Sequence, residues 1–528
     1  MARKKRSFLI VPLIIAVCSL VGGVYGPRVE VAAAASEDEI KASLKTFTRI
    51  YNAVEQNFAD PLDPGKTVYK GAIPGMLRTL DPHSNFFDPR DFQLLREDQK
   101  GHYFGVGMTV APRNHKTIVI APFTGSPAYK AGIRPGDVIM TVNGKPTDNL
   151  NTTEVADLLK GPRGTQVEIV VEREGSREPI TFLVTRDEIS RKSVQDGFWV
   201  RPGVAYIEID SFNETTSTEL EENLRRLGFD SIQALVLDLR DNPGGLLNEG
   251  VAVADKFLAK DQVIVSHRGR ASAEKPYVAR RGNRGYEFPI VVLVNRYSAS
   301  AAEIVAGALQ DHDRGWILGE NTFGKGLVQT VYPLLENTGL ALTTAKYYTP
   351  SGRLIQRDYS NTSFFDYYNH KNLEEKNPLD VKMTDSGRTV YGGGGISPDE
   401  KYETPKFNQF QMRLGRYTFF NFTTRYFGEN DVKITKTWRP DDALIEKFRQ
   451  YLHQEKVEFT EAEFTENLDW VRRGLLREMA VSAFGVEDAR RIEVETDPIV
   501  DVAIDAIPKA KALLENAKRI VAQRTAAP

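Results

Sequence analysis

The sequence predicts a multidomain α/β protein, in which an inserted β-rich domain precedes an α/β core and helical regions stand at both ends. Two observations predict this class. The 528 residues, 41% of them hydrophobic, have an ordinary globular composition and suffice for about three to four domains. Short β-branched segments begin near residue 103, and apolar runs alternate with helical patterns from residue 203 onward. The predicted regions are 1–35, 36–95, 96–188, 189–405 and 406–528.

The overall composition excludes several classes of protein. The 69 basic and 71 acidic residues give a net charge of −2, so the chain has no electrostatic footprint for binding nucleic acid. Cys18 is the only cysteine and lies in the N-terminal apolar segment, which leaves the body without a disulfide, a Cys-ligated zinc or a catalytic thiol. The seven histidines are scattered and show no metal-binding spacing. We therefore expect no dedicated transition-metal site.

The N-terminal segment, residues 1–35, has the pattern of an export signal. Four basic residues at 3–6 precede an uncharged run over residues 7–27, and four alanines follow at 32–35. A signal peptide cut near Ala34 or Ala35 is one interpretation. An uncleaved inner-membrane anchor is the other, because 21 residues at about 1.5 Å each just span a hydrocarbon core of about 30 Å. In both cases we expect the body outside the cytoplasm, in a bacterial periplasm or cell envelope, with membrane contact only through this segment.

Residues 36–95 are predicted to be helical. A capping box at Ser36 and Glu39 starts an amphipathic helix, whose apolar residues recur every three or four positions as far as Phe58. A proline-rich turn ends this helix, and a second helical stretch runs to about Leu80. Residues 80–84, Leu-Asp-Pro-His-Ser, form a turn.

The β-rich region, residues 96–188, contains short strands separated by glycine, proline and asparagine turns, with one helix at Thr153–Leu159. Its motifs are Tyr103-Phe104-Gly105-Val106-Gly107, Gly-Ser-Pro-Ala at 125–128 and Gly-Asp-Val-Ile at 136–139. Their order resembles a PDZ domain, although a generic small β domain with glycine turns would share parts of it. The resemblance implies that residues 103–107 bind the terminal carboxylate of a peptide, whose chain adds to an exposed strand edge.

The α/β core, residues 189–405, alternates apolar strands with helices. The continuous apolar runs indicate strands that are buried on both faces of a sheet. The predicted elements are Val204–Ile209, Ser217–Leu227, Ala234–Leu239, Leu247–Phe257, Ile290–Val294, Ala299–Leu309 and Trp316–Gly319. After about Lys406 the pattern becomes helical again, with the clearest helices at Asp441–Leu452, Glu461–Ala480 and Asp505–Gln523. The apolar stripe of the last helix is expected to pack against the core or against a second copy of the chain.

Three segments of the core carry candidate chemistry. Residues 238–245, Asp-Leu-Arg-Asp-Asn-Pro-Gly-Gly, follow a buried strand, where exposed backbone N–H groups can bind negative charge. Residues 295–304 place two serines between a strand and a helix, and residues 322–329 hold Lys325 between two glycines. Alone, a serine at a helix start is usually an N-cap, and a lysine is usually a surface residue. Together, a buried neutral lysine near the helix start can take a proton from a serine, as in Ser–Lys variants of the catalytic triad.

These motifs together resemble the carboxyl-terminal processing peptidases, also called tail-specific proteases, a family of exported serine peptidases with a PDZ domain. The resemblance covers about residues 37–400 and includes residues 80–84 and the segment Tyr-Tyr-Thr-Pro-Ser-Gly-Arg at 347–353. It implies an α/β protease core of the kind found in ClpP and the crotonases. It further implies that Ser300, and not Ser298, is the nucleophile, that Lys325 is the general base, and that Gln329 orients the lysine. The implied oxyanion donors are the N–H of Ala301 and that of either Gly244 or Gly245.

The resemblance implies an exported serine endopeptidase that recognises the free, apolar C-terminal tails of protein or peptide substrates and cleaves upstream of them. Ser300 would form an acyl-enzyme without any cofactor. An adaptor protein that delivers substrates and a homodimer are further expectations about partners, and nothing in residues 406–528 selects between them.

Two alternatives compete with this interpretation. The chain could be a non-catalytic scaffold protein of the cell envelope that binds peptide tails, although such a protein would be expected to have lost Ser300, Lys325 or Gln329. A histidine triad could also form around Asp311-His312-Asp313. His312 lies 12 residues beyond Ser300, which is about 18 Å of helix, so capping of the helix and local ion pairing with Arg314 are expected instead. Glu303, in the first helical turn, is expected to complement the helix dipole.

Overall fold

The computed structural model describes residues 37–63, 65–360, 362–369, 377–415, 417–430 and 432–526, and it divides the chain into two compact units, 1–73 and 74–528. The predicted signal or anchor in residues 1–35, with Cys18, lies outside the described residues, as does Ser36 of the capping box. In the part of the chain that is described, no helix has both the length and the apolar character needed to span a membrane.

The first unit contains helix α2 (Glu37–Asn57) and a π-helical segment, Gly65–Ala72. Three acidic residues in the first turn of α2 complement the positive end of the helix dipole. The apolar side chains that were predicted to share one face of this helix are exposed: Ile40, Leu44, Phe47, Ile50 and Val54. Helix α3 (Ile73–Leu77) follows at the boundary between the two units.

The β-rich domain is built on one antiparallel sheet in the order β3-β4-β5-β7-β8, with β6 beside β5. Its strands are β3 (Met108–Arg113), β4 (Lys116–Pro122), β5 (Val138–Val142), β6 (Lys145–Pro146), β7 (Gln166–Glu172) and β8 (Ile180–Thr185), and its helices are α5 (Pro127–Ala131) and α6 (Thr152–Leu159). Strands β2 (His102–Gly105) and β9 (Asp187–Ser190), which begin and end the domain in the sequence, pair with each other. Strand β3 is an edge strand, and no described strand pairs with its outer side.

A six-stranded sheet forms the centre of the α/β core. Its order is β10 (Phe198–Arg201), β11 (Val204–Glu208), β12 (Ala234–Asp238), β15 (Ile290–Val294), β16 (Trp316–Gly319) and β21 (Glu400–Lys401). All strands except β10 are parallel to their neighbours. Every residue of β12 and β15 is buried, as the continuous apolar runs predict.

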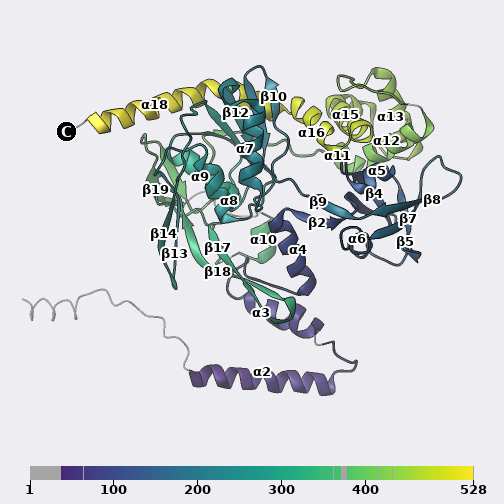
Figure 1. The fold of residues 1–528 in the computed structure, drawn as a ribbon, viewed down its shortest axis with the longest axis horizontal. Coiled ribbons are helices and arrows are strands. Elements are labelled where there is room, and N and C mark those ends of the chain that lie inside the picture. Colours follow the sequence, from purple (N-terminus) through teal and green to yellow (C-terminus); the bar gives the residue numbers. More distant parts are fainter. Residues whose placement is uncertain are drawn as a thin grey trace, which may run out of the picture. The chain divides into compact units, whose positions relative to one another are not determined.

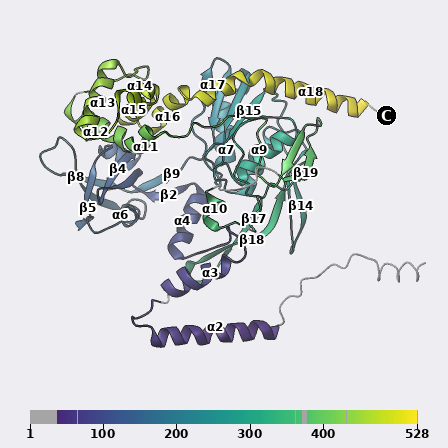
Figure 2. The same cartoon turned by 180° about the vertical axis from the view of Figure 1, so that it is seen from behind.

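Helices cover both faces of this sheet (Figure 1). On one face lie α7 (Thr216–Leu227), α8 (Leu247–Asp255) and α9 (Ala301–Asp311). On the other face lie α17 (Pro498–Asp505) and α18 (Ile507–Ala526) (Figure 2). Ile499, Val500 and Ala503 of α17 pack against Val236 and Leu293 of the sheet. The last helices of the chain therefore complete the α/β core rather than standing apart from it.

A second sheet lies beside the core, with the order β1-β18-β13-β14 and with β17 also paired to β18. The strands are β1 (Asn85–Phe87), β13 (Val263–Gly269), β14 (Ser272–Val278), β17 (Leu327–Pro333) and β18 (Gly339–Tyr348). Nearby elements are α4 (Pro89–Lys100), α10 (Phe364–Tyr368) and the hairpin of β19 (Asn377–Met383) and β20 (Thr389–Gly392). Short 3₁₀ turns occupy Phe229–Ser231 and Leu335–Asn337.

The remaining C-terminal helices are α11 (Gln409–Leu414), α12 (Thr418–Glu429), α13 (Asp442–Gln454), α14 (Glu461–Glu466), α15 (Leu468–Phe484) and α16 (Val486–Glu495). The single helix predicted over Glu461–Ala480 is wrong, because Asn467 breaks it into α14 and α15. The Asn467 side chain is buried and accepts hydrogen bonds from Asn408 and Gln411, a tertiary contact that the helical periodicity does not reveal.

Candidate active site

The structure gathers the residues predicted for catalysis around one cavity of ≈ 690 Å³. Its lining includes Ser300, Lys325, Gln329, Gly244 and Gly245. Ala301 begins α9 directly after Ser300. These residues come from the turn after β12, the start of α9 and the segment that enters β17, so three separate parts of the core converge here.

Ser300 occupies the N-cap position of α9 with an unusual backbone conformation, φ 55° and ψ −112°. This positive φ is costly for a non-glycine residue, and such strain is typically found at functional sites. The hydroxyl of the neighbouring Ser298 is fully buried and donates a hydrogen bond of 2.7 Å to the Leu239 carbonyl. Ser298 therefore ties the serine segment to the turn after β12, whereas Ser300 faces the cavity.

Two backbone N–H groups beside Ser300 have no hydrogen-bond acceptor among the described residues, those of Ala301 and Gly245. The N–H of Gly244, by contrast, donates to Asn242 Oδ1 at 2.8 Å. Gly244 itself lies against the serine, since a Cβ built on it would sit 2.7 Å from Ser300 Cβ and 2.9 Å from the Ala301 nitrogen. Of the two glycines left open by the sequence, Gly245 is thus the one whose N–H is available.

Lys325 enters the cavity from the Gly324-Lys325-Gly326 segment and donates from Nζ to Gln329 Oε1 at 3.1 Å. Gln329 in turn donates from Nε2 to the His83 carbonyl. Burial lowers the pKa of Lys325, and the Glu303 and Asp81 carboxylates only partly oppose this shift. A lysine of this kind is easier to deprotonate than a surface lysine, which suits a general base.

Glu303 has a larger role than the dipole contact predicted for it. Its fully buried carboxylate accepts four hydrogen bonds of 2.5–2.8 Å, which come from the N–H groups of Ser300, Gly324 and Lys325 and from the Thr322 hydroxyl. Burial raises its pKa, although these hydrogen bonds act in the opposite direction. Glu303 therefore joins the backbone of the serine to the backbone of the lysine.

The turn at residues 80–84 supports the lysine from the far side. Asp81 accepts hydrogen bonds from the N–H groups of His83 and Ser84, each of 2.8 Å, and this fixes the His83 carbonyl that holds Gln329. The His83 ring contacts Tyr367, with 2.9 Å between Nε2 and the phenol oxygen. Burial, followed by the charge of Lys325, lowers the pKa of His83 to about 3, so this histidine is neutral near pH 7. The sequence showed the turn but gave no signal that it would support Gln329.

The structure does not form a histidine triad around Asp311-His312-Asp313, because these three residues contact partners other than Ser300. His312 is the C-cap of α9, and its Nδ1 lies 2.7 Å from Asp385. The expected ion pairing with Arg314 is wrong, because Asp311 pairs with Arg353, Asp313 pairs with Arg388, and the Arg314 guanidinium donates to backbone carbonyls. His312 does not line the cavity of Ser300.

The residues predicted to bind a peptide tail lie in a different place from the catalytic set. Tyr103, Phe104 and Gly105 belong to β2, and Val106 and Gly107 form the loop that leads into β3. Within the described residues, the N–H groups of Val106 and Gly107 have no hydrogen-bond acceptor. They stand at the start of the open edge of β3, beside α6, an arrangement that can receive a carboxylate and an added strand. None of residues 103–107 lines the Ser300 cavity.

No group of three or more His, Cys, Asp or Glu side chains within the described ranges is arranged to hold a metal ion.

Two protein-family models match the chain. Residues 203–360 match peptidase family S41, and residues 118–173 match the PDZ domain. The first match contains Ser300, Lys325, Gln329 and the turn after β12, and the second contains β5, β7 and most of β4 in the β-rich domain.

Several proteins with assigned names are similar to the chain. The carboxy-terminal-processing protease of Bartonella bacilliformis is 40% identical over 326 residues, which are 61% of this chain and 74% of the relative. The carboxy-terminal processing protease CtpB of Bacillus subtilis is 30% identical over 439 residues, which are 80% of this chain and 88% of the relative. Among solved structures, the photosystem II D1 C-terminal processing protease is 29% identical, with a TM-score of 0.35 and coverage of 68% of this chain and 87% of that one.

Proposed function

Since this chain belongs to the carboxy-terminal processing peptidase family, we propose that it is a serine endopeptidase that reads the C-terminal tail of a protein substrate and cleaves it with Ser300 and Lys325. One observation carries the proposal. Ser300 stands at a helix start beside the N–H groups of Ala301 and Gly245, which have no acceptor among the described residues, and a buried lysine lines the same cavity.

The chemistry follows from these positions. The neutral Lys325 amine takes the proton of the Ser300 hydroxyl as Oγ attacks the scissile carbonyl carbon. The N–H groups of Ala301 and Gly245 stabilise the oxyanion of the tetrahedral intermediate. The protonated lysine then gives its proton to the leaving amine, and the peptide bond breaks. Water, deprotonated by the same amine, hydrolyses the acyl-enzyme and frees Ser300.

Tail recognition is assigned to the β-rich domain. The N–H groups of Val106 and Gly107 can receive the terminal carboxylate, while the outer edge of β3 can pair with the preceding residues of the substrate. Tyr103, Phe104 and Gly105 hold this loop through the ladder of β2 with β9. An amide at the C-terminus would lack the charge that these donors favour.

The proposal also covers the fold class, the cellular location and the binding partners. These parts are supported by the sequence and by the family resemblance. We place the α/β core in the ClpP and crotonase class, and we place the chain in a bacterial periplasm or cell envelope, exported by residues 1–35. An adaptor and a homodimer are proposed partners. For the homodimer, the exposed apolar stripe of α2 offers a surface on which two copies could meet.

The test is cleavage of a disordered protein with an apolar C-terminus by the full-length chain. Ser300→Ala and Lys325→Ala are each expected to lower kcat by about 10⁴-fold, because the dyad acts as a unit. Lys260→Ala, which removes an exposed lysine, should cleave like the wild type. A substrate with an amidated tail should be cleaved more slowly.

Each contrary result has a defined meaning. Undiminished cleavage by Ser300→Ala, with the melting temperature unchanged, would show that the nucleophile is another residue. Binding of tail peptides without cleavage by the wild type would identify a non-catalytic scaffold protein instead.

A further inference from the structure

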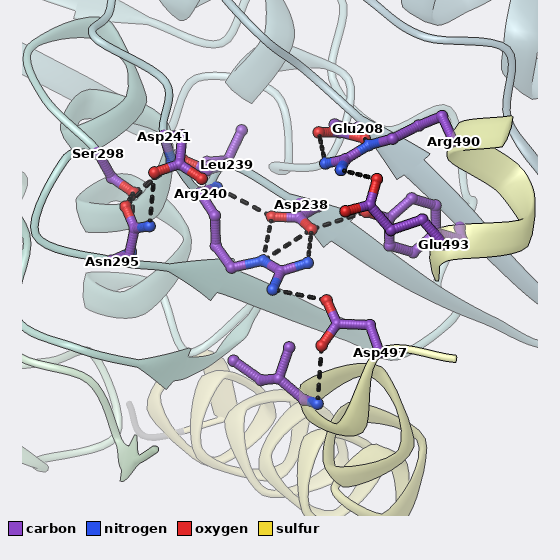
Figure 3. A network of polar contacts seen from close by, with 12 residues as sticks. Glu208, Asp238, Leu239, Arg240, Asp241, Asn295, Ser298, Arg490, Glu493 and Asp497 are labelled. Carbon is purple, nitrogen blue, oxygen red and sulfur yellow. Dashed lines mark hydrogen bonds and ion pairs between the residues drawn. The ribbon is translucent and has the colours of Figure 1, made fainter. Parts of the chain in front are cut away.

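Helix α17, outside the segment that matches peptidase family S41, is joined to the turn that carries Gly244 and Gly245. The joint is an ion pair of 2.8 Å between Arg240 Nη1 and Asp497 Oδ2. Asp497 is the N-cap of α17 and also accepts a hydrogen bond from the Ile499 N–H at 3.2 Å. Figure 3 shows the Arg240 guanidinium between Asp238 and Asp497.

Arg240 is held from its other side by Asp238, the last residue of β12. The Asp238 carboxylate is fully buried, and it accepts from Arg240 Nη2 at 2.6 Å and from the Tyr206 hydroxyl at 2.7 Å. Burial opposes its ionisation, but the Arg240 charge and the hydrogen bonds from Arg240 and Tyr206 together outweigh burial and lower the pKa of Asp238. The guanidinium thus lies between two carboxylates, one from the strand and one from α17.

The residues on both sides of Arg240 contact the nucleophile segment. The Leu239 carbonyl accepts from Ser298, and Asp241 exchanges hydrogen bonds of 3.0 Å with Asn295. The Asn242 carbonyl accepts from the Ala299 N–H at 2.8 Å. A shift of Arg240 would therefore be passed to both sides of the oxyanion site, the Gly245 N–H and the start of α9.

A second contact between the C-terminal region and the carboxyl ends of the strands supports this joint. Glu208 of β11 lies beside Asp238 in the parallel register, and Arg490 of α16 donates to it from Nε at 2.8 Å. Two neighbouring carboxylates at one sheet edge repel each other unless cations lie between them. The segment 486–505 thus supplies one cation directly and fixes the other through Asp497.

We propose that Asp497 is a positioning residue of the peptidase site, which holds Arg240 and through it the turn that carries the Gly245 oxyanion donor. The proposal rests on the function proposed above. It assigns to α17 a role in the reaction, although no residue of α17 lines the cavity of Ser300.

The test compares two substitutions in the same helix. Asp497→Asn removes the charge but keeps a good N-cap residue. Asp501→Asn is the matched control, since Asp501 also pairs with the core, at 2.7 Å from Arg201, but does not touch the turn. With the full-length chain, Asp497→Asn should lower kcat about tenfold, a part of the 10²–10³-fold effect of losing an oxyanion donor. The KM and the tail affinity of Asp497→Asn should stay within about twofold of the wild-type values. The kcat of Asp501→Asn should also stay within about twofold of the wild type.

A second measurement does not require activity. Hydrogen exchange of the amides in residues 239–246 should be roughly tenfold faster in Asp497→Asn than in the wild type, and unchanged in Asp501→Asn. Equal exchange in all three proteins would overturn the proposal, whether or not the wild type cleaves. An equal loss of kcat in the two variants would also overturn it, because it would indicate a general loss of core packing. Absence of cleavage by the wild type, by contrast, would overturn only the proposed function.

Discussion

At the scale of single residues, the site contains two buried ionisable groups, Lys325 and Glu303, whose pKa values are shifted by burial. Lys325 and Glu303 lie within one hydrogen-bonded unit, but their contacts differ. Among the described residues, the lysine amine has one hydrogen-bond partner, Gln329, and it faces the cavity. The glutamate is fully buried and accepts four hydrogen bonds. The first arrangement leaves a group free to exchange a proton, and the second holds a group in place.

The lowered pKa of Lys325 predicts the pH dependence of cleavage. Because the base must be neutral, kcat/KM should rise with pH through a pKa below the ordinary lysine value of 10.5 and then level off. The folded state binds fewer protons at this site than the unfolded state, so its contribution to stability also rises with pH. A profile of kcat/KM from about pH 6 to about pH 10 measures this. Lys325→Arg should be inactive throughout, since its guanidinium stays protonated, and activity in that variant would contradict the assigned base.

Glu303→Gln should impair both stability and cleavage. An amide in this position presents an NH₂ group to backbone N–H donors and leaves at least one of them without an acceptor, at a cost of about 1–3 kcal/mol. Urea unfolding and kcat on the same preparation would measure the two effects. Glu178→Gln, at an exposed position, is the control and should change neither quantity. A fully active and equally stable Glu303→Gln would show that the carboxylate does not hold the two segments together.

At the scale of elements, the site is a junction of segment ends. The turn after β12, the N-terminus of α9 and the start of β17 meet at the carboxyl ends of the parallel strands. In open α/β sheets, ligands bind in the crevice outside these strand ends. The close approach of the turn to Ser300 requires glycine at position 244, where φ is +93° and a Cβ would also contact the Ala299 carbonyl oxygen.

Gly244→Ala should therefore lower kcat by about 10²-fold or more, through displacement of the oxyanion turn. Gly285→Ala separates this effect from backbone strain, because Gly285 also has a positive φ, +86°, but no atom lies within 4 Å of its added Cβ. The control should lose about 1 kcal/mol of stability and keep its activity. Similar kcat values for the two variants would show that the turn need not approach Ser300 closely.

At the scale of the whole second unit, the C-terminal helices connect the β-rich domain with the core. The Thr124 hydroxyl donates to Glu487 of α16 at 2.5 Å, and Arg490, one turn later, binds Glu208 of the core. The next helices, α17 and α18, then cover one face of the central sheet. Residues 406–528 are thus part of the structural frame of the site.

Truncation tests this role. A chain ending at Glu495 would uncover Val236, Val291, Leu293 and Leu318 and lose Ile499 and Val500. At about 1.5–3 kcal/mol for each large apolar side chain, the loss is comparable to the 5–15 kcal/mol that stabilises a typical domain. We expect aggregation or the absence of a cooperative melting transition. A chain ending at Asn516 keeps the buried residues of α18 and should melt like the wild type. Cooperative melting of the shorter chain would contradict the account.

The sequence by itself determined the local structure and the family. Apolar runs predicted β11, β12, β15 and β16 of the central sheet to within one residue, because strand patterns are local. The strands of the second core sheet were not predicted. Motif order predicted membership of the carboxy-terminal processing peptidases, which the comparisons confirm. The catalytic roles of Ser300 and Lys325 stay predictions, although the structure brings both to one cavity.

Only the tertiary structure decided how the site is held. The hydrogen bonds of Glu303, the support of Gln329 by His83 and the contact of Asp497 with Arg240 all join residues that are separated in the chain. Packing likewise leaves the Gly245 N–H without an acceptor among the described residues. The same is true of Asn467, which interrupts a predicted helix through contacts with Asn408 and Gln411. Periodicity predicts which face of an element is apolar. It does not predict the hydrogen-bond partner of a buried polar group, because that partner is set by how the elements pack.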